Sequence, residues 1–427
     1  MTCDPHLIAG NAGSSIGGDF GRQSFEALLD GYVSGLMPPK YSNLTTLRTK
    51  AHTTLYGPRG IQKSTFLDVF FETIPSNFKV AHLSFATVEI LCGSITNPKN
   101  PLLPPRVIPS ILTGADFVKI SEEWSVLGHS GSVEVKISIF NDALESARIS
   151  SSLVKLGQVK IDPEQKEELE RLGITYNSEE ATVSFVPKFV CFTASHLYSR
   201  KILGLLSDFG YRDRFRIVQL KLTSEVAKER FQQEYVPDQA MLEELKKVNR
   251  ELSTVKIKAI ETLPNELFKP VYAKLFQMVD CPDFRLKGDI LRAASSNMVL
   301  RHYSEGKMKD VYTQQDYTFE DSQYIIDQLP SFVEPRIRPL VAGGFEEIGK
   351  TRVRDRAKDH TVAFLEGSAA KGRPGEALSS IHAYVLGRMP SIHFQTATNA
   401  LKELVRAGVV ERVQGMHGFY RISKKEN

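Results

Sequence analysis

Cysteine is scarce in this sequence, and its spacing carries no signature of a metal site or a disulfide framework. The four cysteines lie far apart, and none forms a CxxC pair or has a histidine at the spacing of a zinc ligand. They are Cys3, Cys92, Cys191 and Cys281. A reducing compartment explains this usage most simply, so we expect a cytoplasmic protein, associated with the nucleoid if its host is a cell.

Long apolar runs are also missing, and neither sign of charge is in strong excess. No run approaches the ~20 apolar residues of a membrane span, and the N-terminus lacks the features of a signal peptide, so we expect no membrane partner. The formal net charge of +4 says little about nucleic acid by itself. Because 41% of the 427 residues are hydrophobic and 24% are charged, we expect an ordinary globular chain of roughly two to four domains.

A glycine-containing loop is present at residues 57–64. Its sequence, GPRGIQKS, resembles the phosphate-binding pattern GxxxxGK[ST], except that Gln62 stands where the pattern has its last glycine. The loop follows a β-prone run and precedes a run with apolar residues at helical spacing. Such a turn directs backbone N–H groups and a helix N-terminus at phosphate oxygens. We expect ATP to bind residues Gly57, Pro58, Arg59, Gly60, Ile61, Gln62, Lys63, Ser64 and Thr65.

Two side chains of this loop have specific expected roles. Lys63 would reach the β- and γ-phosphates of ATP, and the Ser64 hydroxyl would ligate Mg²⁺. On the motif alone, the alternative is a glycine-containing turn that happens to precede a lysine.

Three further strand-like segments, at residues 80–85, 116–120 and 189–194, alternate with helical patterns and predict a largely parallel sheet in an α/β fold. The second segment ends in Ser121, Glu122 and Glu123, where an ATPase places acidic groups that hold the metal and activate water. An aspartate is usual at the first position, so Ser121 would replace it beside the metal. Glu122 is the expected base and Glu123 the fallback. The alternative is a solvent-facing glutamate pair that opens a helix.

The order of these features resembles the ATPase region of the minichromosome-maintenance (MCM) replicative helicases, a hexameric AAA+ family. The family's loop typically reads GDPGTAKS and also lacks the last glycine. Residues 120–122, 143–145 and 155–157 resemble its acidic strand end, its helix with a Met-Glu pair and its pre-sensor hairpin. The resemblance implies that Lys155 contacts DNA in the ring's pore and that Ser195 occupies the sensor-1 position.

The same resemblance also identifies two arginines in the second half of the chain as candidate site residues. The phrase Asp213-Arg214-Phe215 resembles the family's Ser-Arg-Phe arginine finger, which implies that Arg214 completes the site of a neighbouring subunit. Residues 284–294 resemble the sensor-2 helix, which implies that role for Arg285, and residues 317–321 resemble the phrase that opens the family's next helix. The alternatives are a surface-paired Arg214 and an ordinary solvent-facing Arg285.

The C-terminal residues predict a winged helix without reference to the family. Helical patterns at 361–367, 376–386 and 393–407 precede a hairpin at 409–422. If this domain binds DNA, the third helix would face the major groove and the hairpin would touch the backbone. The expected contacts are His393, Gln395, Thr396, Asn399 and Lys402 from the helix, and Arg412, His417, Tyr420 and Arg421 from the hairpin. Protein contacts, or packing on the core, are the alternatives.

These features divide the chain into five expected parts. They are a mobile glycine-serine segment with a short helix at 1–39, an AAA+ P-loop ATPase core at 40–245, a helical lid at 246–335, a basic linker at 336–360 and a winged helix at 361–427. The family's large N-terminal DNA-binding collar has no counterpart, and a charged insertion at 162–180 separates the arms of the expected hairpin.

The resulting expectation is an Mg-ATP-dependent homo-oligomer, a hexameric ring by the resemblance, that acts on DNA as a replicative helicase or translocase. Its compact form suggests a mobile-element or viral relative of the cellular helicases. Two alternatives stay open. One is an ATP-gated DNA-binding initiator or regulator, and the other is a structural ring component that hydrolyses ATP weakly, because Ser121 replaces the metal-side aspartate.

Overall fold

The structure is a computed structural model that divides into two compact units, Met1–Val341 and Ala342–Asn427. It describes residues 4–58, 60–96, 106–128, 132–152, 161–177, 182–196, 211, 214–221, 235–279, 284–337, 346–388, 394–416 and 418–423. None of the helices within these ranges is long and apolar enough to cross a membrane.

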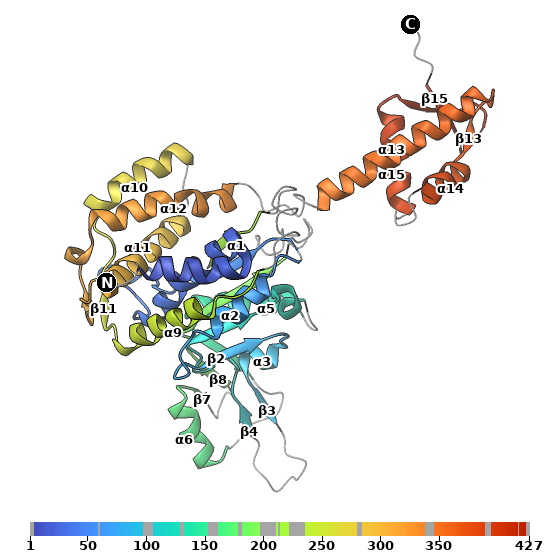
Figure 1. The fold of residues 1–427 in the computed structure, drawn as a ribbon. Helices are drawn as coiled ribbons and strands as arrows, with labels where there is room; N and C mark the ends of the chain where they lie inside the picture. Colours follow the sequence, from blue (N-terminus) through green and yellow to red (C-terminus); the bar gives the residue numbers. More distant parts are fainter. Residues whose placement is uncertain are drawn as a thin grey trace. The chain divides into compact units, whose positions relative to one another are not determined.

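A five-stranded parallel sheet forms the centre of the first unit (Figure 1). The strand order is β10-β1-β9-β5-β2. The strands are β1 (His52–Tyr56), β2 (Val80–Leu83), β5 (Phe117–Ile120), β9 (Val190–Ser195) and β10 (Phe215–Gln219). β5 and β9 are buried along their whole length, as expected for central strands that are covered on both faces. The predicted α/β class with a parallel sheet is therefore confirmed.

The two faces of the sheet belong to two hydrophobic cores. Because successive strand residues point to opposite faces, Phe117 and Phe192 join one core and Val118 and Cys191 the other. The first core includes residues of α1 (Pro5–Leu36), α2 (Lys63–Phe71) and α9 (Gln239–Thr254). The second includes residues of α3 (Val88–Cys92) and α5 (Val133–Leu144).

The N-terminal segment is part of the first core, so the expectation of a mobile tail was wrong for residues 5–36. α1 breaks at Gly17 and Gly18, and its two halves lie antiparallel. At their crossing, a Cβ on Gly13 would stand 2.2 Å from the carbonyl oxygen of Gly21, which only glycine allows. The glycines that indicated flexibility in the sequence thus permit close helix packing.

A buried carboxylate on α1 joins this helix to the sheet and to α12 (Phe319–Ile337). Asp30 is 1% exposed and accepts hydrogen bonds from Arg216 of β10 at 2.5 Å and from the Tyr324 hydroxyl at 3.1 Å. The Arg216 guanidinium also lies 4.6 Å from the centre of the Phe332 ring. Removing one partner of such a buried pair typically costs about 3–5 kcal/mol, so α1 is integral to the unit.

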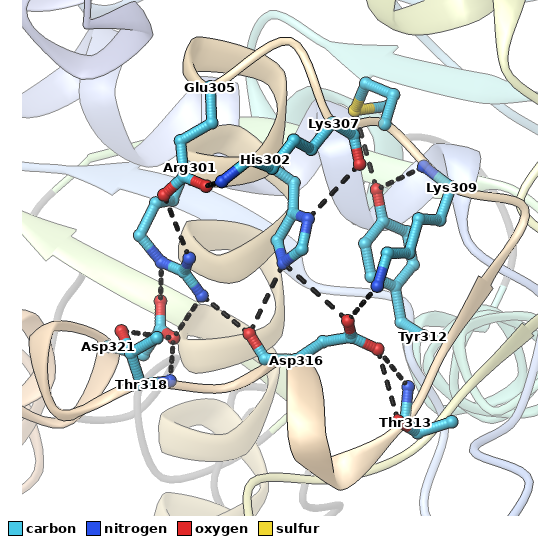
Figure 2. Close-up of polar contacts among 11 residues, drawn as sticks. Arg301, His302, Glu305, Lys307, Lys309, Tyr312, Thr313, Asp316, Thr318 and Asp321 are labelled. Carbon is cyan, nitrogen blue, oxygen red and sulfur yellow. Dashed lines mark hydrogen bonds and ion pairs between the residues drawn. The ribbon is translucent and has the colours of Figure 1, made fainter.

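Helices α9, α10 (Asn265–Met278), α11 (Phe284–Ser304) and α12 follow the sheet, with a short parallel pair, β11 (Ala259–Ile260) and β12 (Val311–Tyr312), between them. Figure 2 shows the polar network that joins α11 to the start of α12. Asp321 is fully buried, accepts from the Thr318 backbone N–H at 2.8 Å and pairs with Arg301 at 3.0 Å. The phrase at 317–321 therefore caps a helix and anchors it to its neighbour.

The insertion predicted between two hairpin arms is present. The arms are β6 (Ile149–Ser152) and β8 (Thr182–Phe185), which pair antiparallel, and between them lie α6 (Pro163–Arg171) and β7 (Thr175–Asn177). A second hairpin comprises β3 (Ser94–Thr96) and β4 (Arg106–Ile108). Gln165 of α6 hydrogen-bonds both the N–H and the carbonyl of Val107 in β4, so this hairpin and the insertion support each other.

The second unit contains the three helices and the hairpin predicted for the C-terminus. In chain order its elements are α13 (Glu346–Ala370), β13 (Glu376–Ala377), α14 (Leu378–Arg388), α15 (Phe394–Arg406), β14 (Val410–Arg412) and β15 (Phe419–Ile422). The strands form an antiparallel sheet in the order β13-β15-β14. α12 runs to Ile337 and α13 begins at Glu346, so much of the expected 336–360 linker is helical.

Candidate functional site

The glycine-containing loop joins the carboxyl end of β1 to the first turn of α2, as the sequence predicts. Gln62 precedes the helix with φ 64° and ψ 20°, the left-handed region that favours glycine. The backbone therefore keeps the conformation of the missing glycine although a side chain is present. At Gly57 a Cβ would lie 2.7 Å from the Leu220 carbonyl oxygen, so this position has no room for a side chain.

Lys63 is enclosed by the loop that precedes it. The residue is 4% exposed, and its ammonium group donates to the carbonyls of Gly57 at 2.9 Å and Pro58 at 2.5 Å. The next two residues, Ser64 and Thr65, are exposed at the start of α2. The loop thus brings a cation, two hydroxyls and a helix N-terminus to one place, a combination that suits phosphate and Mg²⁺. Arg59 lies outside the described residues.

The predicted acidic residues reach the same edge of the sheet. β1, β5 and β9 are parallel, and their register pairs Tyr56 with Ser195 and Ile120 with Thr193. Their carboxyl ends therefore lie together, and the loop, the segment 121–123 and Ser195 follow or end these strands. This is the edge at which parallel sheets bind ligands.

The two glutamates have different surroundings. Glu123 begins α4 (Glu123–Leu127), is 4% exposed and accepts a hydrogen bond of 2.5 Å from the Ser195 hydroxyl. Glu122 is half-buried and pairs with the imidazole of His196. Ser121, the expected metal-side residue, is also half-buried. The structure thus gives Glu123 an internal partner and leaves Glu122 as the more exposed of the two carboxylates.

His196 is a residue that sequence reasoning missed. It directly follows Ser195, the last residue of β9, and this position after a buried strand could have identified it as a candidate in the sequence. Its Nε2 contacts Oε2 of Glu122, whereas its Nδ1 and the Glu122 Oε1 are buried without a hydrogen-bond partner in the described part of the chain. His196 therefore sets the orientation of the Glu122 carboxylate.

Arg214 and Arg285, both identified through the family resemblance, line one cavity of about 370 Å³. Arg214 directly precedes β10, and the strand register pairs Phe215 with His52, the first residue of β1. The cavity therefore lies at the amino edge of the sheet. It also contains further basic side chains and one carboxylate, namely Arg48, Lys50, Arg292 and Glu145. The five residues of β1 separate the two edges by roughly 13 Å.

The cavity's charged groups are held by specific contacts. Arg214 forms an ion pair of 2.6 Å with Glu145, which follows α5. Arg292 donates to the Arg48 carbonyl at 3.0 Å and pairs with Asp289 at 2.8 Å. Lys50 donates to the carbonyls of Gly35 in the last turn of α1 and of Met37 just after it, and burial lowers its pKa to about 8. Glu145 ends the segment 143–145 that resembles the family's Met-Glu pair, and its contact with Arg214 was not expected from the sequence.

His52 connects this cavity to the core. The Cys191 backbone N–H donates to its Nδ1 at 3.0 Å, so its Nε2 carries the proton and donates to the Leu144 carbonyl at 2.9 Å. Burial lowers the pKa of His52 from 6.5 to about 3. The imidazole is therefore neutral, and it fixes the end of α5 next to Glu145.

We expect this histidine to make the unit acid-sensitive. Between pH 6.5 and 3 the unfolded chain binds a proton at His52 that the folded chain does not, so stability falls as pH falls, by up to about 1.4 kcal/mol per pH unit from this group. Denaturant unfolding at several pH values measures the slope. His52→Gln should flatten it across this window, and an unchanged slope in the variant would contradict the assignment.

The residues proposed to contact DNA lie partly within the described second unit. Gln395 and Lys402 on α15 and Arg412 on β14 are exposed, and Thr396 is half-buried. Arg421 is exposed and pairs with Glu411 at 2.6 Å. Lys155, His393 and His417 lie outside the described residues.

Comparison with protein-family models and with curated proteins found no match to this chain. Within the described ranges, no group of three or more His, Cys, Asp or Glu side chains could hold a metal ion.

Proposed function

We propose that this chain is an Mg-ATP-dependent motor of the MCM-like AAA+ type that acts on DNA as a homo-oligomeric ring, a hexamer as in that family. The observation that carries the proposal is the division of the expected site residues between the two edges of one sheet. Lys63, Ser64, Glu122 and Ser195 gather at the carboxyl edge, and Arg214 and Arg285 gather at the amino edge.

The carboxyl edge has the groups needed to bind and cleave a nucleoside triphosphate. The residues fit Mg-ATP because Lys63 supplies a buried cation beside the loop and Ser64 presents an exposed hydroxyl at the start of α2. Bound Mg-ATP supplies the phosphoanhydride bond and a metal that neutralises phosphate charge. Glu122 accepts the proton of the attacking water, while Ser195 and Glu123 hold the ends of β9 and β5 together.

The amino edge supports assembly into a ring. Arg214 precedes β10, and Lys63 follows the opposite end of the neighbouring strand β1. One subunit therefore has these two cations at opposite edges of the sheet. A second copy can place its Arg214 and Arg285 cavity against the first copy's loop, and repeating that head-to-tail contact closes a ring.

The second unit supports action on DNA. Its order of helix, strand, helix, helix and two-stranded hairpin supports the proposal of a winged helix, with Gln395 and Lys402 exposed on the third helix. The same feature favours a second candidate function, an ATP-gated DNA-binding initiator that uses nucleotide only as a switch. ATP-dependent unwinding of a forked duplex separates the two, because a switch does not unwind.

The direct test is Lys63→Ala. Losing a charge-assisted contact to phosphate should weaken ATP binding about 10- to 100-fold and abolish both hydrolysis and unwinding. Binding of a fluorescent ATP analogue, phosphate release and strand separation are the measurements. Lys246→Ala, which alters a surface pair on α9, is the matched control and should behave like the wild type. Equal nucleotide affinity in both variants would refute the phosphate-binding role of the loop.

A further inference from the structure

α10 carries three aromatic side chains at intervals of four residues. Phe268 and Tyr272 meet edge to face with ring centres 4.5 Å apart, and Tyr272 stacks on Phe276 at 5.7 Å with an interplanar angle of 21°. Exposure rises along the series, from 3% for Phe268 to 55% for Phe276. The rings thus lead from the core to the surface, on a helix that packs beside α12 and away from the sheet (Figure 1).

Two lysines lie on the side of the rings. The Lys287 ammonium group, from α11, lies 5.6 Å from the centre of the Phe268 ring and 5.5 Å from that of Tyr272. Lys269 is exposed on α10 itself, and helical geometry places it on the same side as Phe276, whereas the exposed Lys274 is on the opposite side. No carboxylate among the described residues forms an ion pair with Lys269 or Lys287. Within the described residues the surface therefore combines open aromatic area with positive charge, and Glu266 is the single acidic residue of α10.

We propose that this α10 surface binds single-stranded nucleic acid, with bases stacked on Phe276 and Tyr272 and phosphates at Lys269 and Lys287. Aromatic rings bordered by cations are the recurrent means of binding single strands without sequence preference. A duplex keeps its bases stacked inside and cannot offer them to Phe276. An apolar protein partner would have to bury these two lysines.

This site goes beyond the proposed motor function. It lies on the helical region of the first unit and uses neither the ATP-binding loop nor α15. A DNA strand that the proposed motor separates from the duplex would contact this surface in addition to the DNA-binding residues predicted from the sequence. Its occupancy does not require ATP, so it can be tested in a variant that does not hydrolyse.

The test uses the full chain and a thymidine oligonucleotide that contains 4-thiothymidine for photo-crosslinking. We expect adducts in the 265–278 peptide, in the wild type and in Lys63→Ala alike. Phe276→Ala should weaken binding about 5- to 150-fold, the usual effect of losing one stacked base. Phe319→Ala is the matched control, because Phe319 is 62% exposed on α12 outside this ladder.

Two further variants keep the test decisive. Phe276→Trp retains an aromatic face and should keep near-wild-type affinity, which separates stacking from a folding defect. Lys269→Ala with Lys287→Ala should flatten the dependence of log affinity on log salt by about 1.4, or about 0.7 per phosphate contact. Adducts only outside 265–278, equal affinities of Phe276→Ala and Phe319→Ala, or equal competition by duplex would overturn the proposal. ATP hydrolysis, measured separately, reports on the motor function.

Discussion

Arg214→Ala should reduce the rate of ATP hydrolysis about 10³- to 10⁵-fold, the usual loss when an arginine finger is removed. Nucleotide binding should largely persist, because Lys63 and the loop at the other sheet edge are unchanged. Steady-state phosphate release and binding of a fluorescent ATP analogue measure the two quantities. Arg171→Ala, on the exposed face of α6, is the matched arginine control and should leave both unchanged.

Mixing variants tests whether Arg214 acts on a neighbouring subunit. Arg214→Ala subunits keep an intact loop, and Lys63→Ala subunits keep an intact arginine. In an equal mixture about a quarter of the head-to-tail interfaces would pair the two intact halves, so activity should return above that of either variant alone. No recovery, in a mixture that demonstrably co-assembles, would place both residues in one subunit's site.

Glu145 sets a condition on that mechanism. Its carboxylate holds Arg214 at 2.6 Å within one subunit, so the arginine must leave this partner before it reaches a phosphate in another. Because Glu145 is about half exposed, the contact is partly screened by water and is weak enough to exchange. The pair thus keeps Arg214 oriented at the edge until a subunit interface forms.

The parts of the fold that sequence reasoning predicted are those governed by local signals. β5 and β9 lie in strand-like segments of the sequence, and the loop at 57–64 is bounded by a strand and a helix. The helices and hairpin of the second unit likewise show clear periodicity and a glycine stop at Gly408. Each of these signals lies within about 15 residues, which is the distance over which periodicity is informative.

The errors and omissions arose from long-range contacts. The glycines of α1 indicate flexibility when they are considered singly, and only the approach of Gly13 to Gly21 shows that they serve packing. His196 is one residue from a predicted site residue, yet its partner Glu122 lies on another strand's end. Arg214 and Arg285 are far apart in the sequence, and no local pattern indicates that they share a cavity.

Glu122→Gln is the second substitution with a large expected effect. Gln62 and Ser121 depart from the usual pattern, but the backbone at Gln62 has the left-handed conformation that favours glycine, and Glu122 follows β5 at the same edge of the sheet as the loop. If Glu122 is the base, its amide should lower the hydrolysis rate about 10²- to 10⁴-fold while ATP still binds. The measurements are turnover at saturating ATP and affinity for the analogue.

Glu123→Gln is the matched control, because it changes the adjacent glutamate in the same way. Glu123 is buried and bonded to Ser195, so its substitution should act on stability, by about 1–3 kcal/mol. It should leave most of the turnover per folded molecule. A selective loss of turnover in Glu123→Gln, with Glu122→Gln active, would exchange the two roles. Among the described residues His196 pairs with the Glu122 carboxylate alone, so His196→Gln should lower the rate when Glu122 is present and have no further effect in Glu122→Gln.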